Sequence, residues 1–290
     1  MKLSSLTLVQ WRILLFLCWL TVVIFFSAEP IALFLEYGAY AFVGVLAAIF
    51  ANATGAGGGV VFVPFFSQLQ FEQTTIVATS FGIQCFGMTS GSITWFSHYR
   101  KERQNDEKWS SLFNILLYTI PFSIIGLVAA QFLEFGAPQG LNMTFGVFSI
   151  ILAFALYATI PILKSGSNRT QLTQLDKALL PIICLVGGVI TAWLSVGVGE
   201  LVAIYLIFRR FDAPFAIACA VILTAFSVWS GVMYHTFVSN HIFWPIVACA
   251  GLGAVIGGVI AKRVVLFFSA TNLKLFFASW VLLSGIASIT

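Results

Sequence analysis

Charged residues are scarce in this 290-residue chain. Only 8% of its residues are Asp, Glu, Lys or Arg, whereas 60% are hydrophobic, and the mean hydropathy is +1.02. A soluble domain of this length needs a charged surface to stay dispersed, and ten acidic plus fourteen basic residues do not supply one. The outside of the folded protein must therefore be apolar, as it is in proteins embedded in lipid.

Other features that the sequence lacks narrow the possible classes of protein further. The apolar runs lack the alternation of membrane β-strands, so helices are the expected spanning elements. None of the five cysteines has the spacing of a metal site, and the sequence predicts neither a metal nor a cofactor. The net charge of +4 is spread over short loops, so it indicates membrane topology and not nucleic-acid binding.

Nine apolar stretches are separated by polar residues. They cover residues 11–28, 38–67, 74–98, 110–133, 142–163, 178–208, 213–238, 242–262 and 272–290. Most are long enough for the ~20 residues that a bilayer core requires. The polar linker 164–177 divides the chain into halves. We therefore expect an N-terminal transmembrane helix within 1–37, a first repeat over 38–163, a cytoplasmic linker over 164–177 and a second repeat over 178–290.

Two of these stretches are broken by glycine. Residues 38–67 contain Gly55-Ala56-Gly57-Gly58-Gly59, and residues 178–208 contain Ser195-Val196-Gly197-Val198-Gly199. Each stretch is too long for one straight crossing and too broken for a continuous helix. Each also comes first in its half, before three uninterrupted stretches. When Gly55 is aligned with Gly197, Ala78 falls on Ala220 without a gap, which predicts an internal repeat.

The positions of Lys and Arg favour hairpins over crossings. If both broken stretches enter the membrane and turn back, and the N-terminus is cytoplasmic, every Lys and Arg lies on the cytoplasmic side. If both cross, either the basic loop 100–108 or most other basic residues lie outside. The sequence thus predicts an all-α polytopic membrane protein with an inverted repeat. Each half is a glycine-broken re-entrant helical hairpin plus three transmembrane helices, with an extra N-terminal helix and an external C-terminus.

Broken backbone at membrane depth is costly unless it lines a polar cavity. Two inverted hairpins would bring their breaks together near the midplane. The half-helices that follow, expected to begin within 57–60 and 199–202, would present N–H groups and positive dipole ends to a small anion. The alternative is that the glycines serve only close helix packing, as we expect for those of the 251–258 segment.

Polar side chains near the breaks, together with the glycines, are the candidate substrate-binding groups. In the first half they are Asn52, Thr54, Gly55, Gly57, Gly58, Gly59, Thr79, Ser80 and Gln84. In the second half they are Ser195, Gly197, Gly199, Glu200 and Thr224. Any single hydroxyl is as well suited to bonding back to its own helix as to contacting a substrate.

Glu200 is the only acid within a predicted membrane element. Intramembrane acids are rare and usually functional. Beside an anion site an ionised carboxylate would repel the ligand, which makes Glu200 a candidate for proton coupling. A carboxylate that stabilises the first turn of a helix is the alternative interpretation.

The glycine-rich stretch resembles a known motif. Gly55-Ala56-Gly57-Gly58-Gly59, continued by Val60-Val61-Phe62-Val63-Pro64, is similar to the motif of the TauE/SafE family of sulfite exporters, and Ala78-Thr79-Ser80 and His98-Tyr99-Arg100 also resemble that family. The second half, with Gly197-Val198-Gly199-Glu200-Leu201, lacks the full glycine run and the Val-Pro pair. The resemblance covers most of the chain after about residue 38.

The resemblance implies a non-enzymatic transporter in the inner membrane of a bacterium. It would export a small sulfur-containing anion, such as sulfite or a sulfonate, by alternating access, with lipid and protons as further partners. A passive anion channel and a carrier for uptake are the alternatives. A remote one is an intramembrane hydrolase at Thr89-Ser90-Gly91-Ser92, where no motif places a base beside the serine.

Overall fold

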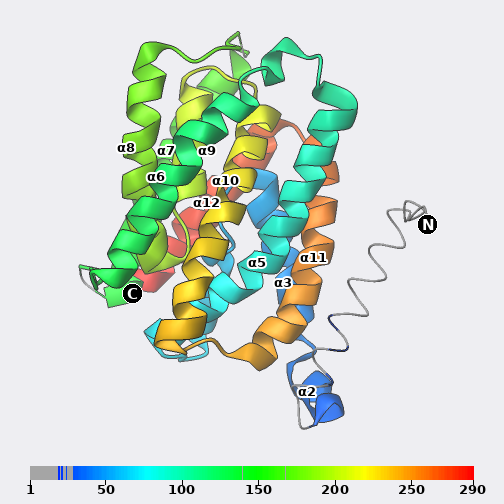
Figure 1. Cartoon of the computed structure of the whole chain (residues 1–290), viewed down its shortest axis with the longest axis vertical. Helices are drawn as coiled ribbons and strands as arrows, with labels where there is room; N and C mark the ends of the chain where they lie inside the picture. The colour runs from blue at the N-terminus through cyan, green and yellow to red at the C-terminus, as the bar shows by residue number, and fades with distance from the viewer. Residues whose placement is uncertain (1–18, 20, 22–23, 25–28, 139, 167) are drawn as a thin grey trace, which may run out of the picture.

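The computed structural model describes residues 19, 21, 24, 29–138, 140–166 and 168–290, and this part of the chain is all-helical (Figure 1). The predicted N-terminal helix over 11–28 lies almost entirely outside the described residues. The α-helices are α2 (Pro30–Tyr37), α3 (Tyr40–Thr54), α4 (Gly59–Gln68), α5 (Gln73–His98), α6 (Leu112–Phe132), α7 (Gly140–Lys164), α8 (Gln174–Leu194), α9 (Val198–Phe208), α10 (Ala213–Tyr234), α11 (Trp244–Phe267) and α12 (Ala270–Ile289). Single turns η1 (Tyr99–Arg103), η2 (Glu107–Trp109) and η3 (His235–Ser239) extend some of them.

Within the described residues, six helices are long and apolar enough to cross a membrane. They are α6 with η2, α7, α8, α10 with η3, α11 and α12, and the pair α2 and α3, bent by 59°, would make a seventh. Helix α5 is not among them, because Thr, Ser, Gln and Gly interrupt its apolar residues. Large apolar side chains such as Leu117, Phe154 and Leu283 are more than 60% exposed on the outside of the bundle. The chain is thus an all-helical protein with an apolar exterior.

The first broken stretch folds back on itself as a helical hairpin. The ring of Tyr40, at the start of α3, lies 6.1 Å from the ring of Phe65 and 6.3 Å from that of Phe66, near the end of α4. Aromatic pairs at these separations add to the stability from burial. The two outer ends of the hairpin are therefore joined by an apolar contact.

The second broken stretch also folds back, but an ionic contact closes it. The carboxylate of Asp176, in the first turn of α8, accepts hydrogen bonds from Tyr205 Oη at 2.7 Å and from Arg209 Nε at the end of α9. The Asp176 side chain is fully buried, so these partners are essential to it.

Helices α3 and α8 end in the same backbone conformation. The C-cap residues are Gly55, with φ of 82°, and Ser195, with φ of 57°, and each donates its N–H to the carbonyl four residues earlier. In this conformation Gly55 corresponds to Ser195, which lies two residues before the Gly197 with which the sequence alignment pairs it. The breaks differ in length, and a serine adopts the conformation for which the sequence pattern suggests glycine.

The two halves pack reciprocally. Helix α3 of the first half packs mainly on α11 of the second, and α8 of the second packs mainly on α6 of the first. Helices α5 and α10 contact each other, as do α7 and α12. Glycines permit the close approach: a Cβ at Gly253 of α11 would overlap the carbonyl of Ala41, and one at Gly126 of α6 would overlap that of Leu185.

The basic stretches gather at one end of the bundle, at the top of Figure 1. Ser111 Oγ donates to the carbonyl of Thr170 in the linker at 2.7 Å, and the N–H of Arg169 donates to the carbonyl of Arg210 at 3.2 Å. Lys262 of α11 lies 3.5 Å from Glu102 of η1. We call this the basic end. Which side of a membrane it faces is a prediction from charge alone.

Candidate functional site

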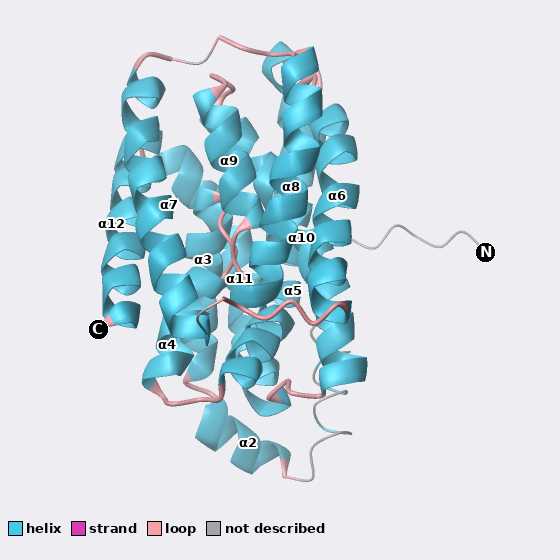
Figure 2. Ribbon diagram, turned by 90° about the vertical axis from the view of Figure 1, so that its left-hand side faces the viewer, coloured by secondary structure: helices cyan, strands magenta, loops and turns pink. Residues whose placement is uncertain are grey.

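The two breaks meet inside the bundle, where Figure 2 shows loop segments between its two ends. A single carboxylate joins them. Oε1 of Glu200 accepts the N–H of Gly57 in the first break at 2.8 Å, and Oε2 accepts the N–H of Gly197 in the second at 2.9 Å. Glu200 is the third residue of α9, where an acidic side chain stabilises a helix start, and it is 2% exposed. The chain's own anion thus occupies N–H groups that we predicted would hold a ligand.

Gln84 of α5 is a second connector between the breaks. Its Oε1 accepts the N–H of Gly58 at 2.7 Å, and its Nε2 donates to the carbonyl and hydroxyl oxygens of Ser195 at 3.0 and 2.7 Å. The hydroxyl of Ser80, one turn earlier, lies 3.1 Å from the same Nε2. All these groups are buried, so each hydrogen bond replaces one that water would otherwise supply.

The backbones of the breaks are in direct contact. A Cβ at Gly59 would lie 2.5 Å from the carbonyl oxygen of Ser195, and one at Gly199 would overlap the carbonyl of Gly55. Because the obstructing atoms are backbone, they cannot rotate away as a side chain does. Glycine is required at these two positions by lack of space.

Other predicted site residues form hydrogen bonds with the backbone of their own or neighbouring helices. The hydroxyl of Thr79 accepts the N–H of Phe243 at the start of α11, at 3.0 Å. Asn52 donates to the carbonyls of Ala48 and Gly87, and the Thr54 hydroxyl bonds back to its own helix at Phe50. The structure therefore brings the glycines, Ser80, Gln84, Ser195 and Glu200 together.

Two candidate groups are buried without a hydrogen-bond partner. They are the Oδ1 atom of Asn52 and the hydroxyl of Thr224. The Thr224 hydroxyl lies against Gly199, at the start of α9, whereas Asn52 lies against Gly91 of α5. Thr224 therefore belongs with the residues at the breaks, and Asn52 contacts the adjoining helix.

Lys274 is a residue at the breaks that the sequence analysis did not include among the candidate site residues. Its ammonium donates to the carbonyl of Thr54, the last residue of α3, at 3.1 Å, and it interacts electrostatically with Glu200. The residue is 2% exposed. Charge counting placed Lys274 on the cytoplasmic side, at the start of the last apolar stretch, and did not anticipate a buried lysine that reaches the first break. The available signal was its position between Leu273 and Leu275, as the only charged residue after Arg263.

Thr191 is a second residue that the sequence did not single out. Its hydroxyl accepts the N–H of Val198, the first residue of α9, at 2.9 Å and donates to the carbonyl of Gly187. It caps α9 from within the same hairpin. A threonine in an apolar helix is too common to have indicated this.

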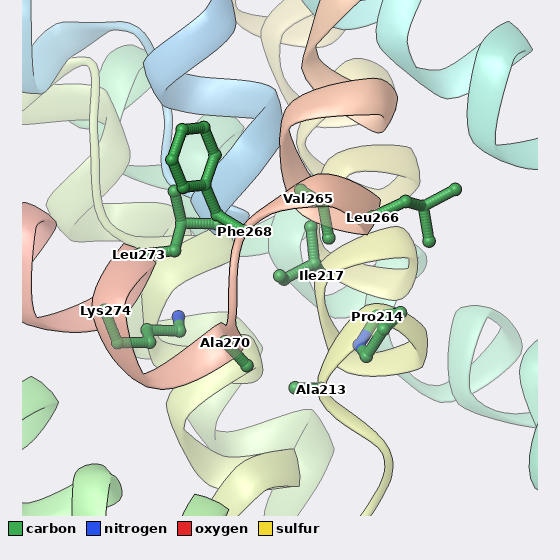
Figure 3. Close-up of a pocket in the computed structure, with 9 residues that line it drawn as sticks. All are labelled: Ala213, Pro214, Ile217, Val265, Leu266, Phe268, Ala270, Leu273 and Lys274. Atoms are coloured by element: carbon green, nitrogen blue, oxygen red, sulfur yellow. The ribbon is translucent and has the colours of Figure 1, made fainter.

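A pocket of about 220 Å³ opens beside Lys274 at the basic end, where α10 begins and α11 ends (Figure 3). Its lining is Ala213, Pro214, Ile217, Val265, Leu266, Phe268, Ala270, Leu273 and Lys274. The lysine side chain extends from α12 toward the interior of this space (Figure 3). Among the described residues, no three His, Cys, Asp or Glu side chains form a group that could hold a metal ion.

An apolar exterior, irregular backbone in the interior and buried ionisable groups are typical of membrane transporters. The sequence profile of the sulfite exporter TauE/SafE family matches residues 40–288. The chain therefore belongs to the TauE/SafE family of sulfite exporters, a family of membrane transporters. No curated protein and no solved structure matches it.

Proposed function

We propose that this protein is a secondary transporter that exports a small sulfur-containing anion, sulfite or a sulfonate, by alternating access. The substrate binds between the two breaks, at Gly57, Gly58 and Gly197 with the side chains of Gln84, Ser195 and Thr224. The family supplies the substrate class. The observation that carries the location is the carboxylate of Glu200, which bridges the N–H groups of both breaks. Groups arranged to hold one carboxylate are suited to another small anion.

The proposed topology is an inverted repeat in which both hairpins are re-entrant. The reciprocal packing of α3 on α11 and α8 on α6 supports it, because corresponding helices then make corresponding contacts. The gathering of basic stretches at one end supports a cytoplasmic N-terminus and an external C-terminus. A reporter fused after Thr290 is expected to behave as external in cells, and a cytoplasmic signal would contradict this topology.

Proton coupling through Glu200 is part of the proposal. A substrate anion that takes the N–H groups of Gly57 and Gly197 must displace the carboxylate, and a buried carboxylate without partners is far more stable when protonated. Anion binding and protonation of Glu200 are then linked, and each favours the other. We expect Glu200→Gln to remove a pH-dependent component of transport. Unchanged pH dependence with normal flux would exclude the coupling.

The transport experiment uses purified protein in proteoliposomes with ³⁵S-labelled sulfite. Saturable uptake that is accelerated by unlabelled sulfite inside the vesicles is expected, because counterflow is the property of a carrier. Conductance without saturation or counterflow would identify a channel. The absence of any sulfite, sulfonate or thiosulfate flux would reject the proposed function. An inside-negative potential is expected to drive export, by about 2.3 kcal/mol per charge at 100 mV.

A further inference from the structure

The ammonium of Lys274 has few partners for so buried a group. It carries three N–H donors, and among the described residues it has one hydrogen-bond acceptor, the carbonyl of Thr54. Burying a charged group is costly unless it is paired and fully hydrogen-bonded. Its opposite charge, Glu200, has both carboxylate oxygens committed to the N–H groups of the breaks. Lys274 therefore retains capacity to bind a further anion.

The pocket beside Lys274 contains no competing polar side chain. Eight of its nine lining residues are apolar, and the lysine extends into it from α12 (Figure 3). A low-dielectric wall around a single cation strengthens its attraction for an anion. The pocket also lies at the basic end, where the positive stretches raise the local concentration of anions.

We propose that this pocket is the anion-access site of the transporter, and that the negative group of the substrate pairs there with Lys274 before it reaches the breaks. The inference rests on the proposed function and adds a residue and a step to it. Lys274 contacts both the pocket and the end of α3 at the first break, so an anion held by it lies beside the N–H groups occupied by Glu200. Glu200 is then the internal competitor that an incoming anion displaces.

A purely structural role for Lys274 has different consequences. A cation at the C-terminal end of α3 stabilises the helix dipole, whether or not a substrate is present. In that case, substitution of Lys274 lowers thermal stability and leaves anion affinity unchanged. Removal of the charge of Glu200 strengthens binding in either case, because its carboxylate occupies the N–H groups of Gly57 and Gly197. Only the access role predicts that loss of the Lys274 charge weakens anion binding.

The test is calorimetric titration of sulfite, and separately sulfoacetate, into the full-length protein in nanodiscs. Lys274→Gln is expected to weaken binding at least tenfold at pH 7, and Glu200→Gln to strengthen it several-fold. The matched control is Lys262→Gln, which removes a partly exposed lysine at the same end of the bundle, and its affinity should stay within twofold of the wild type. Size-exclusion profile and helicity establish that each variant is folded.

A second variant keeps the charge and fills the pocket. Ala270→Trp is expected to reduce sulfite affinity at least fivefold while Lys274 is intact, which covers the case in which Lys274→Gln does not fold. Wild-type affinity in folded Lys274→Gln, or in folded Ala270→Trp, would overturn the access site and leave the proposed function standing. Failure of the wild type to bind or transport any of these anions would overturn both.

Discussion

In both hairpins the helix is interrupted and backbone N–H groups at the break need hydrogen-bond acceptors. The two hairpins differ in which residues supply these acceptors. At the first break, the N–H groups of Gly57 and Gly58 are accepted by Glu200 of α9 and Gln84 of α5, which belong to other elements. At the second break, the N–H groups of Gly197 and Val198 are accepted by Glu200 and Thr191 of the same hairpin. The first break therefore depends on its surroundings for its shape, and the second is largely self-supported.

The hairpins also differ in how their outer ends are held. Aromatic rings around Tyr40 close the first, and the buried Asp176 with Arg209 closes the second at the basic end. A break stabilised from outside responds to movement of its neighbours, whereas a self-supported break moves as a unit. Under the proposed alternating access, we expect the first hairpin to adapt and the second to move as a rigid body.

The largest expected effect is at the contact between the breaks. Gly59→Val should prevent assembly, because its Cβ would lie 2.5 Å from the carbonyl oxygen of Ser195, a backbone atom that no side-chain rotation can move. The yield of monodisperse protein on size exclusion measures it. Gly136→Ala, where no atom lies within 4 Å of the new Cβ, is the control. Normal yield and melting temperature for Gly59→Val would show that the breaks are not in contact.

The next largest effect is expected at the outer end of the second hairpin, which the ion pair of Asp176 and Arg209 closes. Asp176→Asn keeps the size of the side chain and removes its charge, which leaves Arg209 without its ionic partner and should cost about 3 kcal/mol of folding stability. Thermal unfolding in detergent measures the loss. Phe65→Leu is the counterpart at the aromatic end of the first hairpin, and a smaller loss is expected there. Equal losses would remove the distinction between the two ends.

A third variant examines how far the first break depends on α5. Gln84→Leu removes the acceptor of the Gly58 N–H and the donor to Ser195, at an expected cost of about 2 kcal/mol. Thr191→Val, which removes the cap within the second hairpin, should cost about 1 kcal/mol. Thr119→Val controls for loss of a buried hydroxyl that only bonds back to its own helix. A larger loss of stability for Thr191→Val than for Gln84→Leu would contradict the conclusion that the first break depends on its surroundings while the second is largely self-supported.

The smallest effect is expected at an exposed ion pair of the basic end. His98, whose Nδ1 lies 3.1 Å from a carboxylate oxygen of Glu102, lowers the pKa of that carboxyl, and Lys262 adds to the shift. Because the pKa is lowered on folding, the pair stabilises the protein above the ordinary carboxyl pKa and is lost as pH falls through the lowered value. Glu102→Gln should therefore slightly reduce the melting temperature at pH 7, and the reduction should shrink as the pH falls below the ordinary carboxyl pKa. A loss as large as that of Asp176→Asn would mean that exposure does not distinguish the two ion pairs.

Hydropathy and glycine content predicted most of the helical pattern. The predicted stretches 74–98 and 110–133 coincide closely with α5 and α6, and both breaks lie where glycine interrupts an apolar run. The start of α4 at Gly59 lies within its predicted range, whereas α9 begins at Val198, one residue before its range. These features are local, so they are readable from composition and spacing.

The hydrogen-bond partners of the buried charged residues could not be predicted from the sequence. Glu200 bonds to Gly57, 143 positions away in the sequence, and Lys274 bonds to Thr54 across 220 positions. The charge-counting argument placed Lys274 at the cytoplasmic start of the last apolar stretch, because it uses the sign of a residue's charge and not its burial. A lysine that points inward from the first turns of a helix differs from a loop lysine only in the register of the folded bundle.

The reciprocal packing has a consequence for biosynthesis. Helix α3 is made well before its main neighbour, α11. Contacts of such large sequence separation form slowly, and until they form, the small residues of α3 face lipid or a chaperone. We therefore expect the first hairpin to complete its packing only after α11 has been made, and the same holds for the pocket beside Lys274, which is built from α10, α11 and α12.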